Sequence, residues 1–406
     1  MISPKQAKIL AFPYSKYDAL ICDGAVRSGK TSIMMWAFVR WAMENFSGQR
    51  FGVCGRTVDS CTKNIIVPFT AMSLAKERYI IRWRRGDKVM EVRRGAVTNY
   101  FEVFGGKDEA SYTLIQGRTL AGVLLDEVVL MPRSFVEQAL TRCSVDGAKL
   151  WFSCNPGSPQ HWFYTEWIQR HSERNALYLH FEMTDNPGLS QKTLERYQSM
   201  FSGVFYDRYI RGLWVVAEGL IYPMFDESCI VDELPETGEY YVSCDYGTLN
   251  PFSAGLWRWD GKTATRIREY YYSGRESQKN KTDEEYANEI EKLIGEANVK
   301  SIIVDPSAAS FIEVLRRRGY MVRKANNDVT NGIMTTARFL QDGILKVHRS
   351  CKDCIREFSL YRWDGKSADD RPIKENDHAM DETRYFAYTV LKNKAYRREY
   401  TPLWNR

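Results

Sequence analysis

Residues 24–31 constrain the fold of this chain more than any other segment. They match the P-loop pattern G-x-x-x-x-G-K-[ST] at every fixed position. Gly24 and Gly29 let consecutive backbone N–H groups turn inward around phosphate oxygens. Lys30 can reach the β- and γ-phosphates, and the Thr31 hydroxyl can coordinate Mg²⁺. The segment therefore predicts a site for a nucleoside triphosphate.

The flanking sequence supports this prediction. The apolar run 20–22 before the loop is typical of a buried strand, and residues 33–39 after it form an unbroken apolar run. Such a run suits the buried helix that must present its N-terminus to the bound phosphate.

Composition narrows the class of protein. A chain of 406 residues can form two or three domains. No stretch approaches 18 consecutive apolar residues, and the N-terminus lacks the basic-then-apolar plan of a signal peptide, so we expect a cytoplasmic protein without a membrane partner. The net charge of +6 on 57 basic and 51 acidic residues means that any nucleic-acid contact must come from a local patch.

The pattern of strands and helices predicts two domains. Residues 1–215 alternate strand candidates (20–22, 51–54, 122–125, 150–154) with helical stretches, as a parallel α/β sheet requires. Residues 79–92 predict an antiparallel hairpin whose arginines face solvent, with contact to nucleic acid as the alternative. An acidic stretch with Gly and Pro at 216–238 indicates a linker. A second α/β domain follows over 239–406, with strands at 240–245, 254–259, 264–272 and 301–305, and helices at 284–296, from Pro306 to before Gly319, and at 377–392.

An ATPase constellation follows the P-loop. The apolar run 123–125 ends in Asp126 and Glu127, the Walker B arrangement, in which Asp126 would hold Mg²⁺ and Glu127 would orient or deprotonate the attacking water. Arg27 lies inside the loop and could reach the γ-phosphate or the nucleotide of a neighbouring subunit, while Arg56 is a second candidate for such a finger. We expect Gln6 to contact the adenine edge, with simple solvent exposure as the alternative.

Carboxylates mark a second site. Asp245 and Asp305 each end an apolar strand, where ligands bind in open α/β folds. His378 and Asp381 lie three residues apart on one helical face, with Asp377 one turn before Asp381. Together these groups could hold two divalent ions, one activating water and one stabilising the leaving oxygen of a phosphodiester. The alternative for Asp305 is a helix cap before Pro306.

His348, Cys351 and Cys354 have the spacing of metal ligands. No fourth ligand is close in sequence, so the alternative of buried, reduced cysteines is favoured.

The order of these motifs resembles the large terminase subunit of tailed bacteriophages. The more specific stretches are 155–162, 212–215 with 218–223, 245–248, 305–307 and 376–381. The resemblance covers almost the whole chain. It implies a P-loop ATPase domain of the RecA/ASCE type with a parallel sheet, which drives double-stranded DNA into an empty capsid. It also implies an RNase H-like nuclease domain that cuts the DNA concatemer.

The resemblance also assigns residues and cofactors. Ser153 and Asn155 would form the coupling motif that senses the γ-phosphate. Asp245, Asp305 and Asp381 would be the nuclease metal ligands, with His378 as a nearby fourth; Asp381 is preferred to Asp377 because the family's His-x-x-Asp spacing falls on it. The motor would use ATP with Mg²⁺, and the nuclease would use two Mg²⁺ or Mn²⁺ ions. The expected ATP contacts are Gln6, Gly24, Arg27, Ser28, Gly29, Lys30, Thr31 and Asp126.

Partners follow from the same resemblance. They are double-stranded DNA, the portal protein of the procapsid, the small terminase subunit and further copies of the chain in a ring, expected to be a pentamer, although the free protein could be a monomer. The protein would act in the host cytoplasm and at the portal, and be absent from the mature virion. The basic tail is expected to contact the portal or DNA, or to be a solvated end; its residues are Lys392, Lys394, Arg397, Arg398 and Arg406.

Two other functions are open at this stage. One is a P-loop ATPase coupled to a DNA-repair nuclease outside packaging, although no second P-loop core follows residue 238. The other is a nucleotide-dependent structural or signalling protein whose second domain binds without cutting. Three carboxylates placed where DNA phosphates must approach count against it.

Overall fold

The computed structural model describes residues 2–201, 203–234, 236–247, 250–273, 280–365 and 370–395. The chain separates into two units, and the division along the chain falls between Val216 and Ala217. Both units are α/β, which confirms the predicted fold class.

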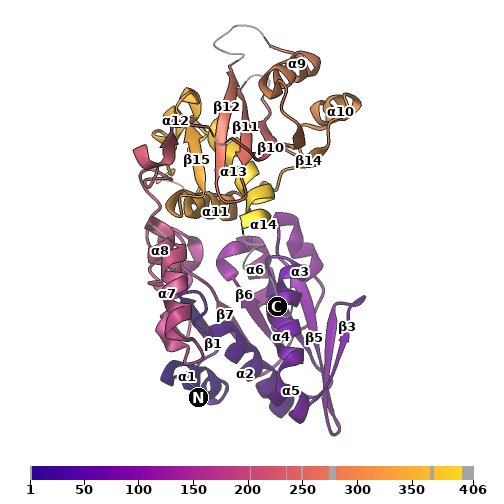
Figure 1. The fold of residues 1–406 in the computed structure, drawn as a ribbon. Helices are drawn as coiled ribbons and strands as arrows, with labels where there is room; N and C mark the ends of the chain where they lie inside the picture. The colour runs from indigo at the N-terminus through magenta and orange to yellow at the C-terminus, as the bar shows by residue number, and fades with distance from the viewer. Residues whose placement is uncertain are drawn as a thin grey trace, which may run out of the picture. The chain divides into compact units, whose positions relative to one another are not determined.

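The first unit is built on an eight-stranded sheet of order β3-β4-β5-β2-β6-β7-β1-β8 (Figure 1). All neighbours from β5 to β8 pair in parallel, and β3, β4 and β5 pair antiparallel. The strands are β1 Ala19–Gly24, β2 Arg50–Gly55, β3 Ile80–Arg84, β4 Val89–Arg94, β5 Val97–Gly105, β6 Gly122–Asp126, β7 Lys149–Ser153 and β8 Ala176–Phe181.

Helices cover both faces of this sheet. α1 to α5 pack on one face of the sheet and share one apolar core. α6 packs on the other face in a second core, and α7 and α8 contribute to a third, smaller apolar cluster. The helices are α1 Pro4–Ala11, α2 Lys30–Asn45, α3 Val58–Cys61, α4 Val67–Ala71, α5 Ser73–Arg78, α6 Arg133–Thr141, α7 Gln191–Met200 and α8 Gly203–Tyr209.

The predicted strands of the first domain are confirmed as β1, β2, β6 and β7, and the predicted buried helix as α2. The predicted hairpin is β3–β4, which lies at the edge of the sheet (Figure 1). Arg82 and Arg84 on β3 face away from the core, whereas Ile81 and Trp83 pack against it. β5 and β8 were not predicted. β5 does not show the expected run of apolar residues, because Asn99 lies within it and is buried. The Asn99 side-chain amide donates hydrogen bonds to the carbonyl oxygens of Ala42 and Phe46.

The second unit has a seven-stranded sheet of order β14-β13-β10-β11-β12-β15-β9. β10–β11 and β11–β12 are antiparallel and the other pairs are parallel. The strands are β9 Ile230–Val231, β10 Glu239–Asp245, β11 Phe252–Trp259, β12 Ala264–Tyr272, β13 Val299–Val304, β14 Val322–Lys324 and β15 Leu345–His348.

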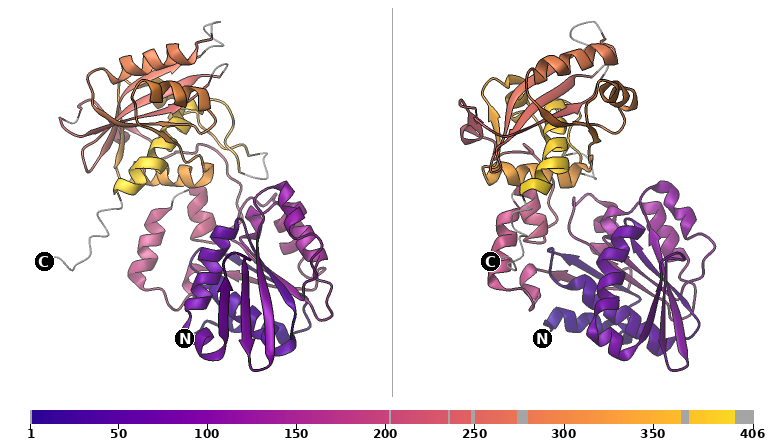
Figure 2. Two further views of the ribbon diagram at one scale, coloured as in Figure 1. Left: turned by 90° about the vertical axis from the view of Figure 1, so that its right-hand side faces the viewer. Right: turned by 45° about the vertical axis from the view of Figure 1, so that its right-hand side comes forward.

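This sheet is also covered on both faces. α9 and α10 share the apolar core of one face, and α13 packs on β10 and β11 from the other, as Figure 2 shows. The helices are α9 Asp283–Ile294, α10 Ala309–Arg317, α11 Val329–Gln341, α12 Lys352–Phe358, α13 His378–Phe386 and α14 Lys392–Ala395.

Three expectations for this unit need correction. The stretch 216–238 is not simply a linker, because Leu220 forms a bridge to Arg362 and β9 pairs with β15. The helix expected from Pro306 begins only at Ala309, since residues 305–308 form a turn. The C-terminal helix is not one regular α-helix, because a π-helical segment, Ala387–Leu391, separates α13 from α14.

Two of the expected tail cations lie within the second unit. Lys394 forms an ion pair with Glu239, and the Lys392 ammonium lies 4.2 Å from the centroid of the Tyr388 ring. Arg397, Arg398 and Arg406, as well as Thr248 of the stretch 245–248, fall outside the described residues. None of the described helices has the length and apolar character that crossing a membrane requires.

Candidate nucleotide and metal sites

The P-loop geometry requires glycine at both of its fixed positions. Gly24 ends β1 with a φ of +125°, and a Cβ there would lie 1.9 Å from the carbonyl oxygen of Phe181. Gly29 has a φ of +80°, and its own Cβ would lie 2.7 Å from the side-chain nitrogen of Gln6. Gln6 is buried and therefore lies against the loop rather than in solvent. A capping box with Ser3 fixes it at the start of α1.

Lys30 is the buried cation of this loop. Its Nζ donates to the carbonyl oxygens of Gly24 at 3.2 Å and Ala25 at 2.9 Å, and to Asn155 Oδ1 at 2.8 Å. Burial lowers the pKa of Lys30, and the neighbouring charge of Asp126 offsets this only in part. The side chain expected to bind phosphate therefore contacts one of the two residues expected to sense it.

Asp126 receives two hydroxyl donors. β6, β7 and β1 are adjacent parallel strands, so their carboxyl ends meet at one edge, and Asp126 and Ser153 are register partners. Thr31 Oγ1 donates to Asp126 Oδ1 at 3.0 Å, and Ser153 Oγ donates to the same oxygen. Burial raises the pKa of Asp126, and these two hydrogen bonds act against that rise.

Glu127 has a left-handed backbone, with a φ of +56°, directly after β6. Burial raises the pKa of its carboxyl group, the Asp126 charge adds to the rise, and the charge of Arg56 opposes it. An acid with a raised pKa next to a Walker B aspartate suits the role of a general base. Arg56 is thus close enough to influence this group.

Arg27 is held at the surface of the loop. Its φ is +57°, and its carbonyl oxygen accepts a hydrogen bond from the Asn186 side chain at 2.7 Å. Its guanidinium lies 5.7 Å from the ring centroid of Tyr197 on α7. Ser28, by contrast, is buried, and its hydroxyl has no hydrogen-bond partner among the described residues. That hydroxyl is free to accept or donate to a ligand in the loop.

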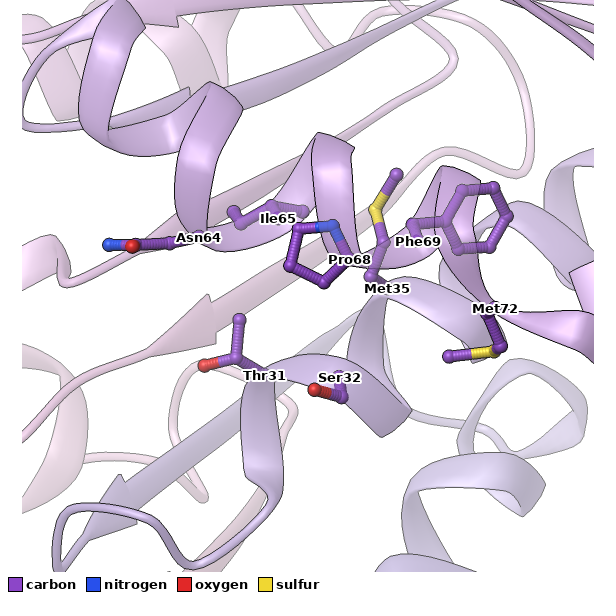
Figure 3. A pocket seen from close by; sticks show the side chains of 8 residues that line it. All are labelled: Thr31, Ser32, Met35, Asn64, Ile65, Pro68, Phe69 and Met72. Carbon is purple, nitrogen blue, oxygen red and sulfur yellow. The ribbon is translucent and has the colours of Figure 1, made fainter. Parts of the chain in front are cut away.

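A small hollow lies behind the first turn of α2 (Figure 3). It is lined by Thr31, Ser32 and Met35 of α2 and by mostly apolar side chains of the segment 64–72. It has room for about one water molecule, and its walls are mostly apolar. It is therefore a gap in the packing of α2 and is too small for a nucleotide.

Sequence reasoning missed Asp23, which is fully buried one residue before the P-loop. It accepts a hydrogen bond from Trp214 Nε1 at 2.6 Å, and His180 Nδ1 lies 3.0 Å from its other oxygen. The hydrogen bond to Asp23 raises the pKa of His180. An acidic residue inside the apolar run 20–22 would have indicated a functional group. Asp23 instead follows that run and precedes a glycine, where residues that form turns are common.

In the second unit, Asp245 and Asp305 lie side by side. Their strands β10 and β13 pair in parallel with Cys244 opposite Val304, so both aspartates emerge at the same sheet edge. His378 Nδ1 lies 2.9 Å from Asp245 Oδ2. Burial raises the pKa of Asp245 to about 6, although the hydrogen bond to His378 acts to lower it.

Asp305 is held by two donors. The Ser307 backbone N–H donates to Oδ1 at 2.7 Å, and the Tyr385 hydroxyl donates to Oδ2 at 2.6 Å. Burial acts to raise the pKa of Asp305, but these hydrogen bonds outweigh it and hold the pKa below its usual value. Asp305 thus forms the turn before α10 and is not the cap of that helix, whose first turn follows Ala308.

Asp381 on α13 has a cation on each oxygen. Arg384 donates to Oδ1 through Nη2 at 2.9 Å and Nε at 3.2 Å, and Lys374 Nζ lies 3.5 Å from Oδ2. The same ammonium lies 3.2 Å from Oδ2 of Asp377. Asp377 and Asp381 are both buried, so the structure brings both candidates to this edge.

Tyr385 links the three aspartates expected to bind metal. Its hydroxyl donates a hydrogen bond to Asp305. Burial raises the pKa of this hydroxyl, and the nearby charges of Asp245 and Asp381 raise it further. Tyr385 thus lies near all three carboxylates, and oxygen donors of this kind are those that Mg²⁺ and Mn²⁺ prefer. Within the described residues, however, no three His, Cys, Asp or Glu side chains are grouped as a metal ion requires. The donor chemistry fits divalent ions, while the carboxylate oxygens are engaged by the protein's own donors.

His348, Cys351 and Cys354 do not form a metal site. His348 contacts Ser350 and the carbonyl oxygen of Asp232, and Cys351 Sγ donates to the carbonyl oxygen of Arg266 at 3.6 Å. Cys354 is buried beside Thr383, and every cysteine is free. Cys351 and Cys354 are buried, as expected of core cysteines.

Comparison with known proteins places both sites in one family. Residues 21–228 match the family described as "Terminase large subunit, T4likevirus-type, N-terminal", and residues 247–388 match the terminase RNaseH-like domain. The chain belongs to the large terminase subunits. The resemblance drawn from the motifs is thereby confirmed.

Solved structures agree with this assignment. The large terminase of a thermophilic bacteriophage is 48% identical, with a TM-score of 0.91, over 96% of this chain and 99% of that one. A structure of the same phage protein in complex with ADP is 47% identical with a TM-score of 0.90, covering 96% of this chain and all of the other. The terminase large subunit of Escherichia phage T5 is 24% identical over 236 residues, which are 54% of this chain and 53% of that protein. The alignment thus spans about half the length of this curated relative.

A buried ion pair fixes the terminase helix α13 behind the carboxylates. Arg266 Nη1 donates to Glu382 Oε2, and both side chains are fully buried. Ser243 and Trp257 donate to the other Glu382 oxygen, Trp257 at 2.9 Å. Sequence reasoning missed Glu382, Arg384 and Tyr385, although the i, i+3 and i, i+4 spacing from Asp381 and His378 could have indicated them.

Proposed function

We propose that this large terminase subunit hydrolyses ATP to move double-stranded DNA into a procapsid and cuts concatemeric DNA with its second unit. The observation that carries the motor half is one contact network. In it, Lys30 and Asp126 of the nucleotide site contact Asn155 and Ser153 of the expected coupling motif directly. A change at the γ-phosphate can therefore reach β7 through two side chains.

In the motor site, each residue has a separate task. The loop N–H groups and Lys30 would bind the phosphates, and Thr31 with Asp126 would hold Mg²⁺. Glu127, whose pKa is raised by burial, would accept a proton from the attacking water. Gln6 lies against Gly29, close to the loop. Structures of the thermophilic phage terminase in complex with ADP and with ATP-γ-S support nucleotide binding by this chain.

Arg27 and Arg56 remain the two finger candidates. Arg27 lies on the loop surface against Tyr197, where it could act on a neighbouring subunit's nucleotide. The charge of Arg56 acts to lower the pKa of Glu127. If Arg27 acts on a neighbour's nucleotide, the site is complete only in a ring, and the isolated protein would hydrolyse ATP slowly.

In the nuclease site, Asp245, Asp305 and Asp381 would hold two divalent ions, with His378 beside Asp245. Bound ions of this kind activate water and stabilise the leaving oxygen of a phosphodiester. His378 orients the Asp245 carboxylate, and Tyr385 orients that of Asp305. Arg384, paired with Asp381 and buried, fixes the third carboxylate from behind.

The partners and location follow from packaging. We propose a ring of copies on the portal of the procapsid, with the small terminase subunit delivering DNA, in the host cytoplasm and only transiently at the capsid. A repair role outside packaging is the competing function. It predicts the same two activities but no dependence on procapsids.

A packaging assay separates these functions. Purified protein, ATP, linear DNA and procapsids of the phage that encodes this chain are mixed, and DNA protected from DNase is measured. The proposal expects protection that requires procapsids and is lost in Lys30→Ala. Protection at the same level without procapsids, or none with active ATPase and intact portal, would contradict it.

A further inference from the structure

Lys374 provides a cation inside the proposed nuclease site. Its Nζ lies 3.2 Å from Asp377 Oδ2 and 3.5 Å from Asp381 Oδ2, so one ammonium bridges two carboxylates. The carboxylate side chains of Asp377 and Asp381 are only 6% and 12% exposed. Buried carboxylates need a cation close by, and Lys374 supplies one.

The two cations of this site differ in freedom. The side chain of Arg384 is 2% exposed and is packed against Gly332, where a Cβ would lie 2.5 Å from its Cγ. The side chain of Lys374 is 72% exposed. Arg384 is therefore a fixed part of the site, whereas Lys374 can leave it by rotating into solvent.

One of the two oxygens that Lys374 contacts belongs to the proposed metal ligand Asp381, and the other belongs to the neighbouring Asp377. Asp381 Oδ1 faces Arg384, so Oδ2, the oxygen next to Lys374, is the one available to an added cation. Asp377 contacts His378 Nε2 through Oδ1 at 3.7 Å, and Lys374 through Oδ2. A divalent ion and the ammonium would compete for the same edge.

We propose that Lys374 is a tethered cation that competes with divalent metal for Asp377 and Asp381, and so sets how much metal the nuclease needs. The inference rests on the proposed metal-dependent nuclease. When Lys374 rotates out, the two carboxylates lose their neutralising charge, which favours metal uptake. When metal is scarce, the ammonium keeps the acidic edge neutral and the site inactive.

The test is Mn²⁺ binding to the full chain without nucleotide or DNA, followed by the electron paramagnetic resonance signal of free Mn²⁺. Lys374→Met removes the charge and keeps the aliphatic chain. At the free energy typical of an ion pair with an exposed partner, its loss should tighten Mn²⁺ binding by up to about fivefold. Lys374→Arg keeps a cation and should stay near wild type. Lys292→Met is the matched control, since its side chain is also 72% exposed and it pairs with Glu289 on α9.

A double variant ties the effect to the site. In an Asp381→Asn background, Lys374→Met should tighten Mn²⁺ binding less than in the wild type, because only the competition at Asp377 remains. Unchanged or weaker binding in Lys374→Met, with wild-type circular dichroism, would overturn the proposal. If the wild type itself bound no Mn²⁺ and cut no DNA, the nuclease function would fail instead, so the two failures are distinguishable.

Discussion

Ser153→Ala is expected to raise the Mg²⁺ requirement of the ATPase without removing a ligand. Asp126 Oδ1 accepts hydrogen bonds from two hydroxyls, Thr31 at 3.0 Å and Ser153. A hydrogen bond to a charged group contributes about 1.5–3 kcal/mol. At about 1.4 kcal/mol per factor of ten, its loss weakens Mg²⁺ binding about 10- to 100-fold, which agrees with the usual effect of residues that orient a metal ligand.

The assay is ATP hydrolysis as a function of Mg²⁺ concentration at fixed ATP. Ser153→Ala should shift the half-saturating Mg²⁺ concentration and leave the rate at saturation much closer to wild type. Because the Ser153 hydrogen bond lowers the pKa of Asp126, its loss should move the acid limb of the rate to higher pH. Ser158→Ala is the control, since Ser153 and Ser158 are both 1% exposed and the Ser158 hydroxyl accepts a hydrogen bond from the Gln160 N–H at 3.2 Å, away from Asp126. An unshifted Mg²⁺ dependence in a folded Ser153→Ala protein would refute the reasoning.

Three further outcomes are expected. First, burial raises the pKa of Asp245 to about 6, so its proton competes with metal below that value. The apparent Mn²⁺ affinity should fall about fivefold between pH 6 and pH 5. His378→Ala removes a hydrogen bond that lowers this pKa and should move the fall to higher pH, and a pH-independent Mn²⁺ titration would speak against it. Second, Arg266→Met leaves Glu382 buried without its cation and should lower the unfolding free energy of the second unit, measured in urea, by about 3–5 kcal/mol. The double variant Arg266→Met with Glu382→Leu should recover most of that loss. An equal loss in both variants would exclude the ion pair as the cause. Third, Gly29→Ala should abolish ATP binding in a titration with labelled nucleotide, because its φ is +80° and the added Cβ would meet the Gln6 side chain; normal affinity would show that the loop tolerates another backbone.

Most residues of the proposed nucleotide site could be chosen from the sequence, because their pattern is local. Gly24 to Thr31 are consecutive, and Asp126 ends a strand whose apolar run is easy to recognise. Parallel pairing then places Ser153 beside Asp126. What could not be predicted is Asp23, since its partner Trp214 is 191 residues away along the chain.

Less of the proposed nuclease site could be chosen from the sequence, for a physical reason. The strand ends identified Asp245 and Asp305, and helical spacing identified His378 and Asp381. The cations that neutralise them follow no local rule. Lys374 precedes α13 in an irregular segment, and its charge alone looks like that of any solvated lysine.

The most direct test of two separable activities in one chain compares Lys30→Ala and Asp245→Ala with wild type. Each folded protein is assayed for ATP hydrolysis and for plasmid cleavage with Mn²⁺. The account predicts that Lys30→Ala loses ATP hydrolysis and keeps cleavage, while Asp245→Ala loses cleavage and keeps ATP hydrolysis. Loss of both activities in either folded variant, or no Mn²⁺-dependent cleavage by wild type, would contradict it.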